Sequence, residues 1–304
     1  MLHFYAHGKL LITGEYSVLD GALALAVPTK KGQHLYIEPS DQNDILWESR
    51  DKDGKIWFET TLTYNEISEA QIANPEDPKQ RLLQLLRTAQ KLNPQFLAEK
   101  TALKITTRLE FDRNWGLGTS STLVYMLAKW AQVNAYRLLE LTFGGSGYDL
   151  ACAGSETAIL YQKSLGEPTV YQTTFNPPFS DQLFFVYLNK KQNSREAITN
   201  YRNQPKAGQE LLKNKISGIS ETLLKCEDLT SFCMLINAHE QLIGRALNTT
   251  PIKQMHFSDY TGSIKSLGGW GGDFILATGS DIEQDYFRSK GYQTIIAFDE
   301  MVLD

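Results

Sequence analysis

The sequence predicts an α+β fold with two domains in one chain. The length of 304 residues suggests two domains, since one domain usually takes roughly 100 to 200 residues. Both halves also mix two patterns: short apolar or alternating segments, typical of strands, and longer stretches with apolar residues at spacings of three and four, typical of helices. We expect the boundary near residue 165, which separates domains 1–165 and 166–304.

The first half is predicted to consist mainly of strands. These are expected at 22–28, 33–38, 45–48, 56–61 and 102–111. The hairpin-type turn 51–55 contains Asp53-Gly54 and joins the third strand to the fourth. A helix is expected at about 79–91, with a buried stripe of leucines. Those leucines are Leu82, Leu83, Leu85 and Leu86. A second helix, 123–133, follows the glycine turn 116–121, so the local order is strand, glycine turn, helix.

The second half begins with strands and continues with helices. Strands are expected within 157–188, where Pro168, Pro177 and Pro178 act as breakers. Helices are expected at 195–201, 208–226 and 229–247, and a further helix is expected to run to about residue 267. Two late strands, 274–278 and 293–298, flank a short helix that begins near Asp281.

Composition and charge exclude several classes of protein. Hydrophobic residues make up 42% and charged residues 21%, as in ordinary soluble globular chains. Lys and Arg total 30 against 35 Asp and Glu, a net charge of -5, so no overall basic field attracts nucleic acid or an anionic membrane. The three cysteines have unrelated spacings, and the first twenty residues lack the pattern of an export signal. We therefore expect a cytoplasmic protein with neither a nucleic-acid nor a membrane partner.

The most informative segment is Trp115-Gly116-Leu117-Gly118-Thr119-Ser120-Ser121. Glycines allow backbone N–H groups to turn toward a ligand, and the N-terminus of the following helix favours a phosphate. The segment is not a Walker loop, since no Gly-Lys-Ser/Thr follows. It is not a dinucleotide fingerprint either, since Ser121 stands where a third glycine is required. The structural alternative, that Thr119 or Ser120 only caps the helix, stays open.

Two further glycine clusters are candidates for function. The first, 265–273, has four glycines in five positions just before a predicted strand, which is costly to order unless the backbone must approach something closely. The second, 144–149, ends in Asp149, which is suited to accept a proton from a substrate hydroxyl. The alternatives are a tight packing turn for the first and a helix cap at Asp149 for the second.

In the N-terminal segment 8–16, an apolar stretch lies between one cation, Lys9, and one acid, Glu15. An ammonium group can neutralise charge on a transferring phosphoryl group. Glu15 could orient Lys9 or a substrate hydroxyl. An ordinary surface position is the alternative for both residues.

Taken in order, these four segments resemble the motifs of the GHMP kinase superfamily, which includes galactokinase, homoserine kinase, mevalonate kinase and phosphomevalonate kinase. Residues 6–19 resemble its N-terminal motif, with His7 where proline is usual. Residues 112–121 resemble its phosphate loop, Pro-x-x-x-Gly-Leu-Gly-Ser-Ser-Ala, with Asp112, Thr119 and Ser121 departing from it. Residues 265–273 resemble Lys-x-x-Gly-Ala-Gly-Gly-Gly-Asp, with Gly269 and Trp270 departing. The resemblance covers nearly the whole chain.

The resemblance implies a fold, a reaction and two ligands. The fold would have an N-terminal ribosomal-S5-like α/β domain and a C-terminal ferredoxin-like domain. The reaction would be ATP-dependent phosphorylation of a small molecule, with Mg²⁺ near Ser120 and with Asp149 and Lys9 as the catalytic residues. The residues implied to bind the phosphates of ATP are Gly116, Leu117, Gly118, Thr119, Ser120 and Ser121. The residues implied to bind the substrate are Glu15, Tyr16, Lys191, Ser194, Gly268, Gly269, Gly271 and Gly272.

The phosphoryl acceptor is less closely defined. Gly14-Glu15-Tyr16, Ser146 to Asp149 and Gly271 to Asp273 look most like phosphomevalonate kinase, which favours a mevalonate-pathway substrate. Residues 190–194 resemble a substrate-side loop of those kinases, whose lysines would meet a substrate phosphate; the alternative is a helix start in which Asn193 and Glu196 form a capping box. Residues 147–151 instead resemble a branch with a Gly-Tyr-Asp-Ile-Ala motif.

Several points stay open at this stage. An ATP-dependent decarboxylase of the same superfamily and a catalytically silent ligand sensor are the two competing functions. Trp270 could narrow the site, stack on a base or cover the phosphates. The acidic Mg²⁺ ligand is unassigned, with Glu140 as one candidate, and the oligomeric state is open, a homodimer included.

Overall fold

A computed structural model describes residues 1–303 except 42, 70–72, 75, 193 and 206–207. The side chains of residues 194 and 195 are also outside the description. The chain divides into two compact units. Unit 1 consists of Met1–Gly8, Lys31–Arg113 and Gly118–Gly154, and unit 2 of Lys9–Lys30, Asn114–Leu117 and Ser155–Asp304. The chain therefore passes between the units several times; the boundary at residue 165 stays a prediction.

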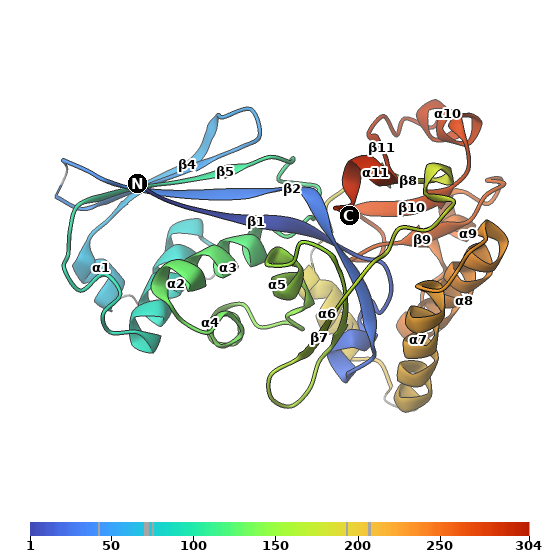
Figure 1. Ribbon diagram of the computed structural model, residues 1–304, viewed down its shortest axis with the longest axis horizontal. Coiled ribbons are helices and arrows are strands. Elements are labelled where there is room, and N and C mark those ends of the chain that lie inside the picture. Colours follow the sequence, from blue (N-terminus) through green and yellow to red (C-terminus); the bar gives the residue numbers. More distant parts are fainter. Residues whose placement is uncertain (42, 70–72, 75, 193, 206–207, 304) are drawn as a thin grey trace. The chain divides into compact units, whose positions relative to one another are not determined.

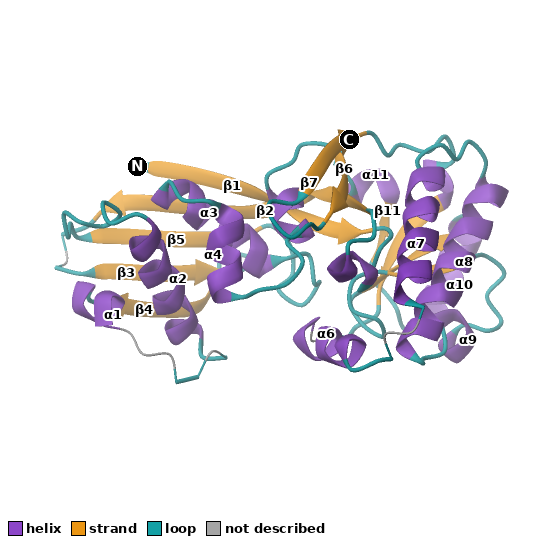
Figure 2. Cartoon of the chain, turned by 90° about the horizontal axis from the view of Figure 1, so that it is seen from below, coloured by secondary structure: helices purple, strands orange, loops and turns teal. Residues whose placement is uncertain are grey.

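Unit 1 is a sheet covered on one face by helices (Figure 1, Figure 2). The strands pair in the order β4-β3-β5-β2, and β1 pairs with β2. Strands β3 and β5 are parallel, whereas β4 and β2 are antiparallel to their neighbours. The strands are β1 (Leu2–Leu11), β2 (Ala24–Pro39), β3 (Ile45–Arg50), β4 (Ile56–Leu62) and β5 (Leu103–Leu109). The helices are α1 (Tyr64–Glu69), α2 (Pro78–Leu92), α3 (Thr119–Ala131), α4 (Ala135–Thr142) and α5 (Tyr148–Ala153).

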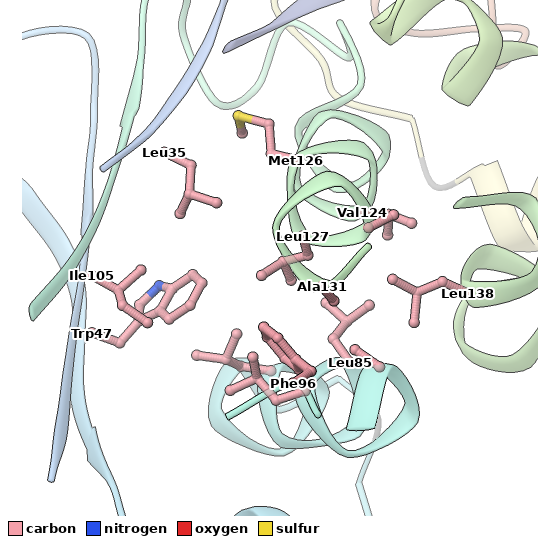
Figure 3. Packing of buried hydrophobic residues seen from close by; sticks show 14 of the residues in the cluster. Leu35, Trp47, Leu85, Phe96, Ile105, Val124, Met126, Leu127, Ala131 and Leu138 are labelled. Atoms are coloured by element: carbon pink, nitrogen blue, oxygen red, sulfur yellow. The ribbon is translucent and has the colours of Figure 1, made fainter. Parts of the chain in front are cut away.

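The core of unit 1 is an apolar layer between this sheet and its helices (Figure 3). Trp47 from β3 and Ile105 from β5 face Leu85 from α2 and Leu127 from α3, and all four are buried. The predicted leucine stripe of α2 is confirmed, because each of its four leucines is buried. Burial of such a stripe is what stabilises a helix against a sheet.

Unit 2 contains a four-stranded antiparallel sheet in the order β11-β8-β10-β9, and β6 and β7 continue from the first part of β2. The strands are β6 (Ala158–Gln162), β7 (Thr169–Thr173), β8 (Leu183–Tyr187), β9 (Ile264–Ser266), β10 (Phe274–Thr278) and β11 (Ile295–Ala297). The helices are α6 (Ser194–Arg202), α7 (Gln209–Leu223), α8 (Leu229–Leu247), α9 (Ile252–His256), α10 (Asp281–Ser289) and α11 (Phe298–Met301). Short 3₁₀ turns occupy Ser17–Asp20 and Ser180–Gln182.

The α+β class is confirmed, and most predicted elements are present with shifted ends. Helix α8 and strand β10 have the predicted bounds, whereas the two strands expected at 22–28 and 33–38 form one continuous strand, β2. The helix expected to run to residue 267 is wrong. Helix α9 ends at His256, and residues 264–266 pair with β10 as strand β9 instead, because cross-strand pairing overrides a local helical pattern. Within the described residues, no helix is long and apolar enough to cross a membrane.

Candidate active site

The N-terminus of α3 is formed by the predicted phosphate loop. Gly118 is the N-cap residue in a left-handed conformation, with φ of 93°, and as a glycine it has no side chain to cap the helix. Thr119, Ser120 and Ser121 are therefore first-turn residues, so the alternative that Thr119 or Ser120 serves as the cap is wrong. The hydroxyl of Ser121 is buried and donates to the Gly118 carbonyl at 2.8 Å, whereas Ser120 is exposed. First-turn N–H groups without a capping side chain are the usual partners of a bound anion.

The residues just before this helix, 114–117, belong to unit 2 and lie against β1. The Lys9 backbone N–H donates to the Leu117 carbonyl at 3.0 Å, and the Lys9 ammonium donates to the Gly116 carbonyl at 2.9 Å. Gly116 has φ of 67°, which favours glycine. Lys9 thus contacts the glycine turn through both its main chain and its side chain.

Asp149 is a first-turn residue of α5, a helix that packs on α3 within unit 1. The N-cap residue is Gly147 and not Asp149, although Asp149 Oδ1 accepts the N–H of Leu150 at 3.0 Å. The side chain is only partly buried. Its position close to the phosphate loop stays a prediction.

The glycine loop 267–273 uses its glycines for two different reasons. Gly268 and Gly271 have φ of 64° and 86°, a region that other residues rarely adopt. Gly269 and Gly272 instead lie directly against residues 190–192. A Cβ at Gly269 would lie 2.5 Å from Cγ of Gln192, and one at Gly272 would lie 2.9 Å from the Lys190 carbonyl oxygen. The expectation that the backbone here approaches something closely is therefore met by the segment 190–192.

Asp273 closes this loop and is the residue that sequence reasoning left without a role. It has φ of 55°, and only 7% of its surface is exposed. Its N–H donates to the Lys190 carbonyl at 2.7 Å, and its Oδ1 accepts the Gln192 N–H at 3.1 Å. Burial raises the pKa of the Asp273 carboxyl, while the charges of Lys9 and Lys191 oppose this rise. The signal that could have found it is a charged residue at the end of a glycine run, in the last position of the family motif.

Solved structures of known proteins match this chain over nearly its full length. Mevalonate kinase of Methanococcus jannaschii is 15% identical, with a TM-score of 0.69 over 97% of this chain and 96% of that one. Phosphomevalonate kinase of Streptococcus pneumoniae, in complex with phosphomevalonate and AMPPNP, is 16% identical, with a TM-score of 0.69 over 97% and 99%. Galactokinase of Lactococcus lactis, complexed with galactose, is 12% identical, with a TM-score of 0.70 over 99% and 93%. The chain has the GHMP kinase fold. No protein-family model and no curated protein matches its sequence.

The departure of this chain from the GHMP kinase motif at Trp270 has a structural explanation. Only 8% of Trp270 is exposed, and the residue packs in an apolar cluster with Tyr16 and Tyr201. Its backbone N–H donates to the Tyr16 hydroxyl at 3.1 Å, and the rings of Tyr16 and Tyr201 stack with centroids 5.5 Å apart. Trp270 therefore fastens the glycine loop to the N-terminal motif and to α6.

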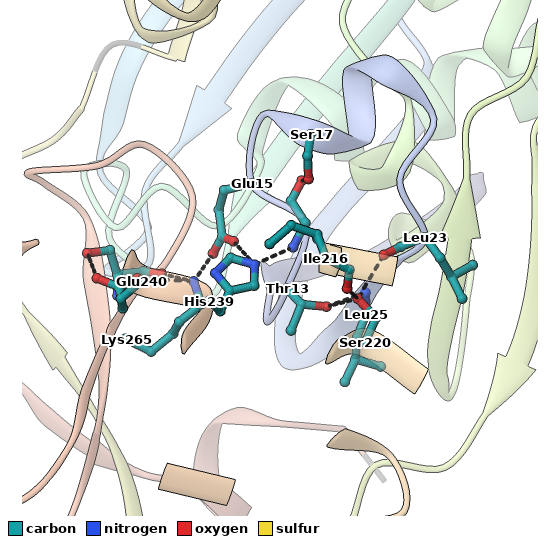
Figure 4. A network of polar contacts seen from close by, with 12 residues as sticks. Thr13, Glu15, Ser17, Leu23, Leu25, Ile216, Ser220, His239, Glu240 and Lys265 are labelled. Carbon is teal, nitrogen blue, oxygen red and sulfur yellow. Dashed lines mark hydrogen bonds and ion pairs between the residues drawn. The ribbon is translucent and has the colours of Figure 1, made fainter. Parts of the chain in front are cut away.

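Glu15, in the segment 6–19, lies in a buried polar cluster (Figure 4). Its Oε1 accepts from the Lys265 ammonium at 2.5 Å, and its Oε2 lies 3.3 Å from His239 Nε2. Glu240 lies 3.5 Å from the same ammonium and accepts the Ser266 N–H at 3.0 Å. Only 1% of Glu15 is exposed. Its direct contact with substrate stays a prediction, which this burial does not favour.

Burial governs protonation in this polar cluster. It raises the pKa of Glu15 to about 7, with Lys265 opposing the rise, and it also raises the pKa of Glu240. Burial and the charge of Lys265 hold the pKa of His239 well below its usual range. The His239 ring is therefore neutral, and its Nε2 accepts the Gly14 N–H at 2.9 Å. The cluster holds two carboxyl groups and one ammonium, so ionisation of both carboxyl groups leaves an excess buried negative charge.

For the remaining residues that the sequence predicts in the site, the structure gives fewer contacts. Lys191 is exposed next to Asp273. Ser194 is the first residue of α6, but its side chain is outside the described residues, as is the whole of Asn193 with the capping box predicted for it. Glu140 forms an exposed ion pair with Arg137 on α4. Among the described residues, no group of three or more His, Cys, Asp or Glu is arranged to hold a metal ion.

Proposed function

We propose that the chain is an ATP-dependent kinase that transfers the γ-phosphoryl group to a hydroxyl or phosphate of a small metabolite. The observation that carries this proposal is the N-terminus of α3, where a glycine turn contacted by Lys9 leads into a first turn whose N-cap residue, Gly118, has no side chain that could cap it. Such a terminus favours an anion by about 0.3 to 1 kcal/mol before any ligand-specific contact. The GHMP kinase fold supports the assignment, since the similar structures named above are small-molecule kinases.

Each residue has a stated part in this proposal. Bound ATP supplies the phosphoryl group, and Mg²⁺ neutralises part of its charge. The backbone of residues 116–121 binds the phosphates, and the exposed hydroxyl of Ser120 is the proposed metal ligand. The ammonium of Lys9 stabilises charge that develops on the transferred group. Asp149 accepts the proton of the acceptor hydroxyl or orients that hydroxyl.

For the acceptor, we propose a mevalonate-pathway compound, phosphomevalonate or mevalonate. The support is the sequence of the motifs together with the position of the two lysines at 190 and 191, both exposed beside the glycine loop. A phosphorylated acceptor needs cations of this kind. Tyr16, Ser194 and the glycines of the loop 267–273 complete the proposed substrate site. A homodimer and a cytoplasmic location stay predictions.

The deciding experiment is an ADP-release assay against mevalonate, phosphomevalonate, homoserine and a panel of sugars, with the product mass determined. A phosphate-ester product identifies a hydroxyl acceptor, and a diphosphate product identifies phosphomevalonate. Release of carbon dioxide would indicate the decarboxylase. Nucleotide binding without ADP release for any acceptor would contradict the kinase and favour the silent sensor.

A second test addresses Asp149. The Asp149→Asn variant is expected to lose turnover, because Asn cannot take the proton, while ATP affinity and Tm stay close to those of the wild type. The matched control is Asp285→Asn, which removes the same charge from an exposed position on α10. Near-normal kcat in Asp149→Asn would show that the assignment of the base is wrong.

A further inference from the structure

Asp273 lies where residues from three distant parts of the sequence meet within unit 2. Its backbone is fixed in the left-handed conformation by two hydrogen bonds, from its own N–H to the Lys190 carbonyl and from the Leu188 N–H at 2.8 Å to its carbonyl. Among residues with a side chain, Asp and Asn adopt this conformation most readily. The two backbone hydrogen bonds therefore set the direction of the Asp273 carboxylate.

The carboxylate of Asp273 occupies the space above Gly116. A Cβ at residue 116 would lie 2.6 Å from both carboxylate oxygens, closer than any van der Waals contact allows. Position 116 must therefore be glycine for two reasons, its positive φ and this carboxylate. The same turn accepts the Lys9 ammonium at the Gly116 carbonyl. The Gly116 turn is thus held between the anion of Asp273 and the cation of Lys9.

The Asp273 carboxylate has positive charges and a hydrogen-bond donor around it. Lys9 and Lys191 both attract its carboxylate, and the Gln192 N–H donates to it. An anion in this position orders the cation, but it also repels any polyanion that comes to the same turn. The carboxylate therefore favours catalysis, because it orders the cation, and opposes binding, because it repels the polyanion.

We propose that Asp273 is a positioning residue, whose carboxylate fixes the Gly116 turn and thereby holds the Lys9 ammonium in the arrangement that phosphoryl transfer needs. This inference rests on the proposed kinase function. The proposed role can be told apart from a purely structural one by its effect on nucleotide affinity. The carboxylate weakens the binding of the nucleotide while it raises the rate of phosphoryl transfer.

The first test is Asp273→Asn, which keeps the shape and the tolerance for a positive φ but removes the charge. We expect the Kd of ATP to fall about 3- to 10-fold, because a like charge is removed, and kcat to fall about 10-fold or more, because Lys9 is less well held. The Tm is expected to change by no more than about 2 °C. Asp285→Asn is the control and should change none of the three. An unchanged kcat, or a loss of affinity together with a loss of Tm, would overturn the proposal.

The second test does not depend on turnover. Gly116→Ala is expected to lower Tm strongly, since its methyl group overlaps the carboxylate. In the Asp273→Gly background the same substitution should lower Tm much less, because only the positive φ then opposes it. Equal losses in the two backgrounds would show that the carboxylate does not lie on Gly116. If the two losses differ but the wild-type chain phosphorylates no acceptor, the kinase function fails while the placement of Asp273 stands.

Discussion

The two units differ in the charged side chains that they bury: unit 1 buries Glu48, paired with the partly exposed Arg50 and Lys104, whereas unit 2 buries a cluster of charged and polar groups. The core of unit 1 is apolar, with Trp47, Leu85 and Leu127 among its members (Figure 3). Unit 2 has apolar clusters as well, but beside them it buries Glu15, Lys265, Glu240 and His239 (Figure 4). Apolar burial is non-directional and tolerates many sequences, whereas a buried charge is stable only when its partners are correctly placed.

This difference in buried side chains indicates which feature of the structure each unit determines. The apolar core of unit 1 stabilises a scaffold whose helices begin at candidate functional residues. The polar cluster of unit 2 fixes a register, because Glu15 lies in the N-terminal segment 6–19 and Lys265 lies on β9, just before the glycine loop 267–273. A pair that joins residues 250 positions apart in the sequence aligns the two motifs in a way that apolar packing alone does not.

The largest expected effect tests the polar cluster. Lys265→Met removes the ammonium that pairs with Glu15 and Glu240, and is expected to lower the free energy of unfolding by about 3 to 5 kcal/mol. The measurement is denaturant unfolding at pH 7. The double variant Lys265→Met/Glu15→Gln should recover part of the loss. A loss below about 1 kcal/mol would mean that the ion pair with Glu15 contributes little.

The next effect tests the apolar core. Leu127→Ala removes a fully buried side chain from α3 and should cost about 2 to 5 kcal/mol through lost burial and a residual cavity. Leu123→Ala, on the same helix but only partly buried, is the matched control and should cost clearly less. Urea unfolding curves of both variants measure the difference. Similar losses at the two positions would contradict the assignment of Leu127 to the core centre.

A pH-dependent effect distinguishes the two interiors directly. Burial raises the pKa of Glu15 from an ordinary value of 4.5 to about 7. Between these values the folded chain retains a proton that the unfolded chain has released, so Glu15 makes the protein less stable as pH rises. The stability of the wild type relative to Glu15→Gln should therefore fall by about 1 to 3 kcal/mol between pH 4.5 and 7.

The comparison with Glu15→Gln is needed because His239 acts in the opposite direction. Its lowered pKa contributes stability that is lost as pH falls below its unfolded value, and this contribution is present in both proteins. Glu221→Gln, an exposed position on α7, is the control. A flat difference between wild type and Glu15→Gln across this range would show that Glu15 is already ionised at pH 5.

The smallest expected effect is the same in both units. Asp77 caps α2 in unit 1 by accepting the Gln80 N–H at 2.8 Å, and Asp228 caps α8 in unit 2 by accepting the Ser231 N–H at 2.8 Å. Replacing either residue by alanine should cost about 1 kcal/mol. Thermal unfolding of the two variants measures the cost. A much larger loss in one unit would mean that the capping residue there has a role beyond its own helix.

Local patterns predicted the elements whose signals are local. The leucine stripe of α2 and the periodicity of α8 are readable because helix and strand spacing are set by backbone geometry. The pattern failed at 264–266, where pairing with β10 makes a strand, and it missed β1, whose polar residues His7 and Lys9 interrupt the apolar ones. In both places the element is decided by pairing with another strand, which the local pattern does not show.

The residues of the candidate site likewise divide into those that the sequence predicts and those that depend on contacts in the folded structure. The glycine loops and the residues Lys9 and Asp149 are predicted from sequence, because glycine runs and a charged residue next to them are visible in one dimension. The role proposed for Asp273 and the burial of Glu15 were not, since each depends on a residue more than a hundred positions away.

What the sequence alone determined is therefore the class of the fold, the order of its main elements and the identity of the motifs, all of which follow from the short-range geometry of the backbone. The tertiary structure decided which charged groups are buried together. It also decided at which positions only glycine fits, because another segment of the chain lies against the backbone there. The physical reason is that burial and electrostatic interaction act through space, between groups that chain order does not place together.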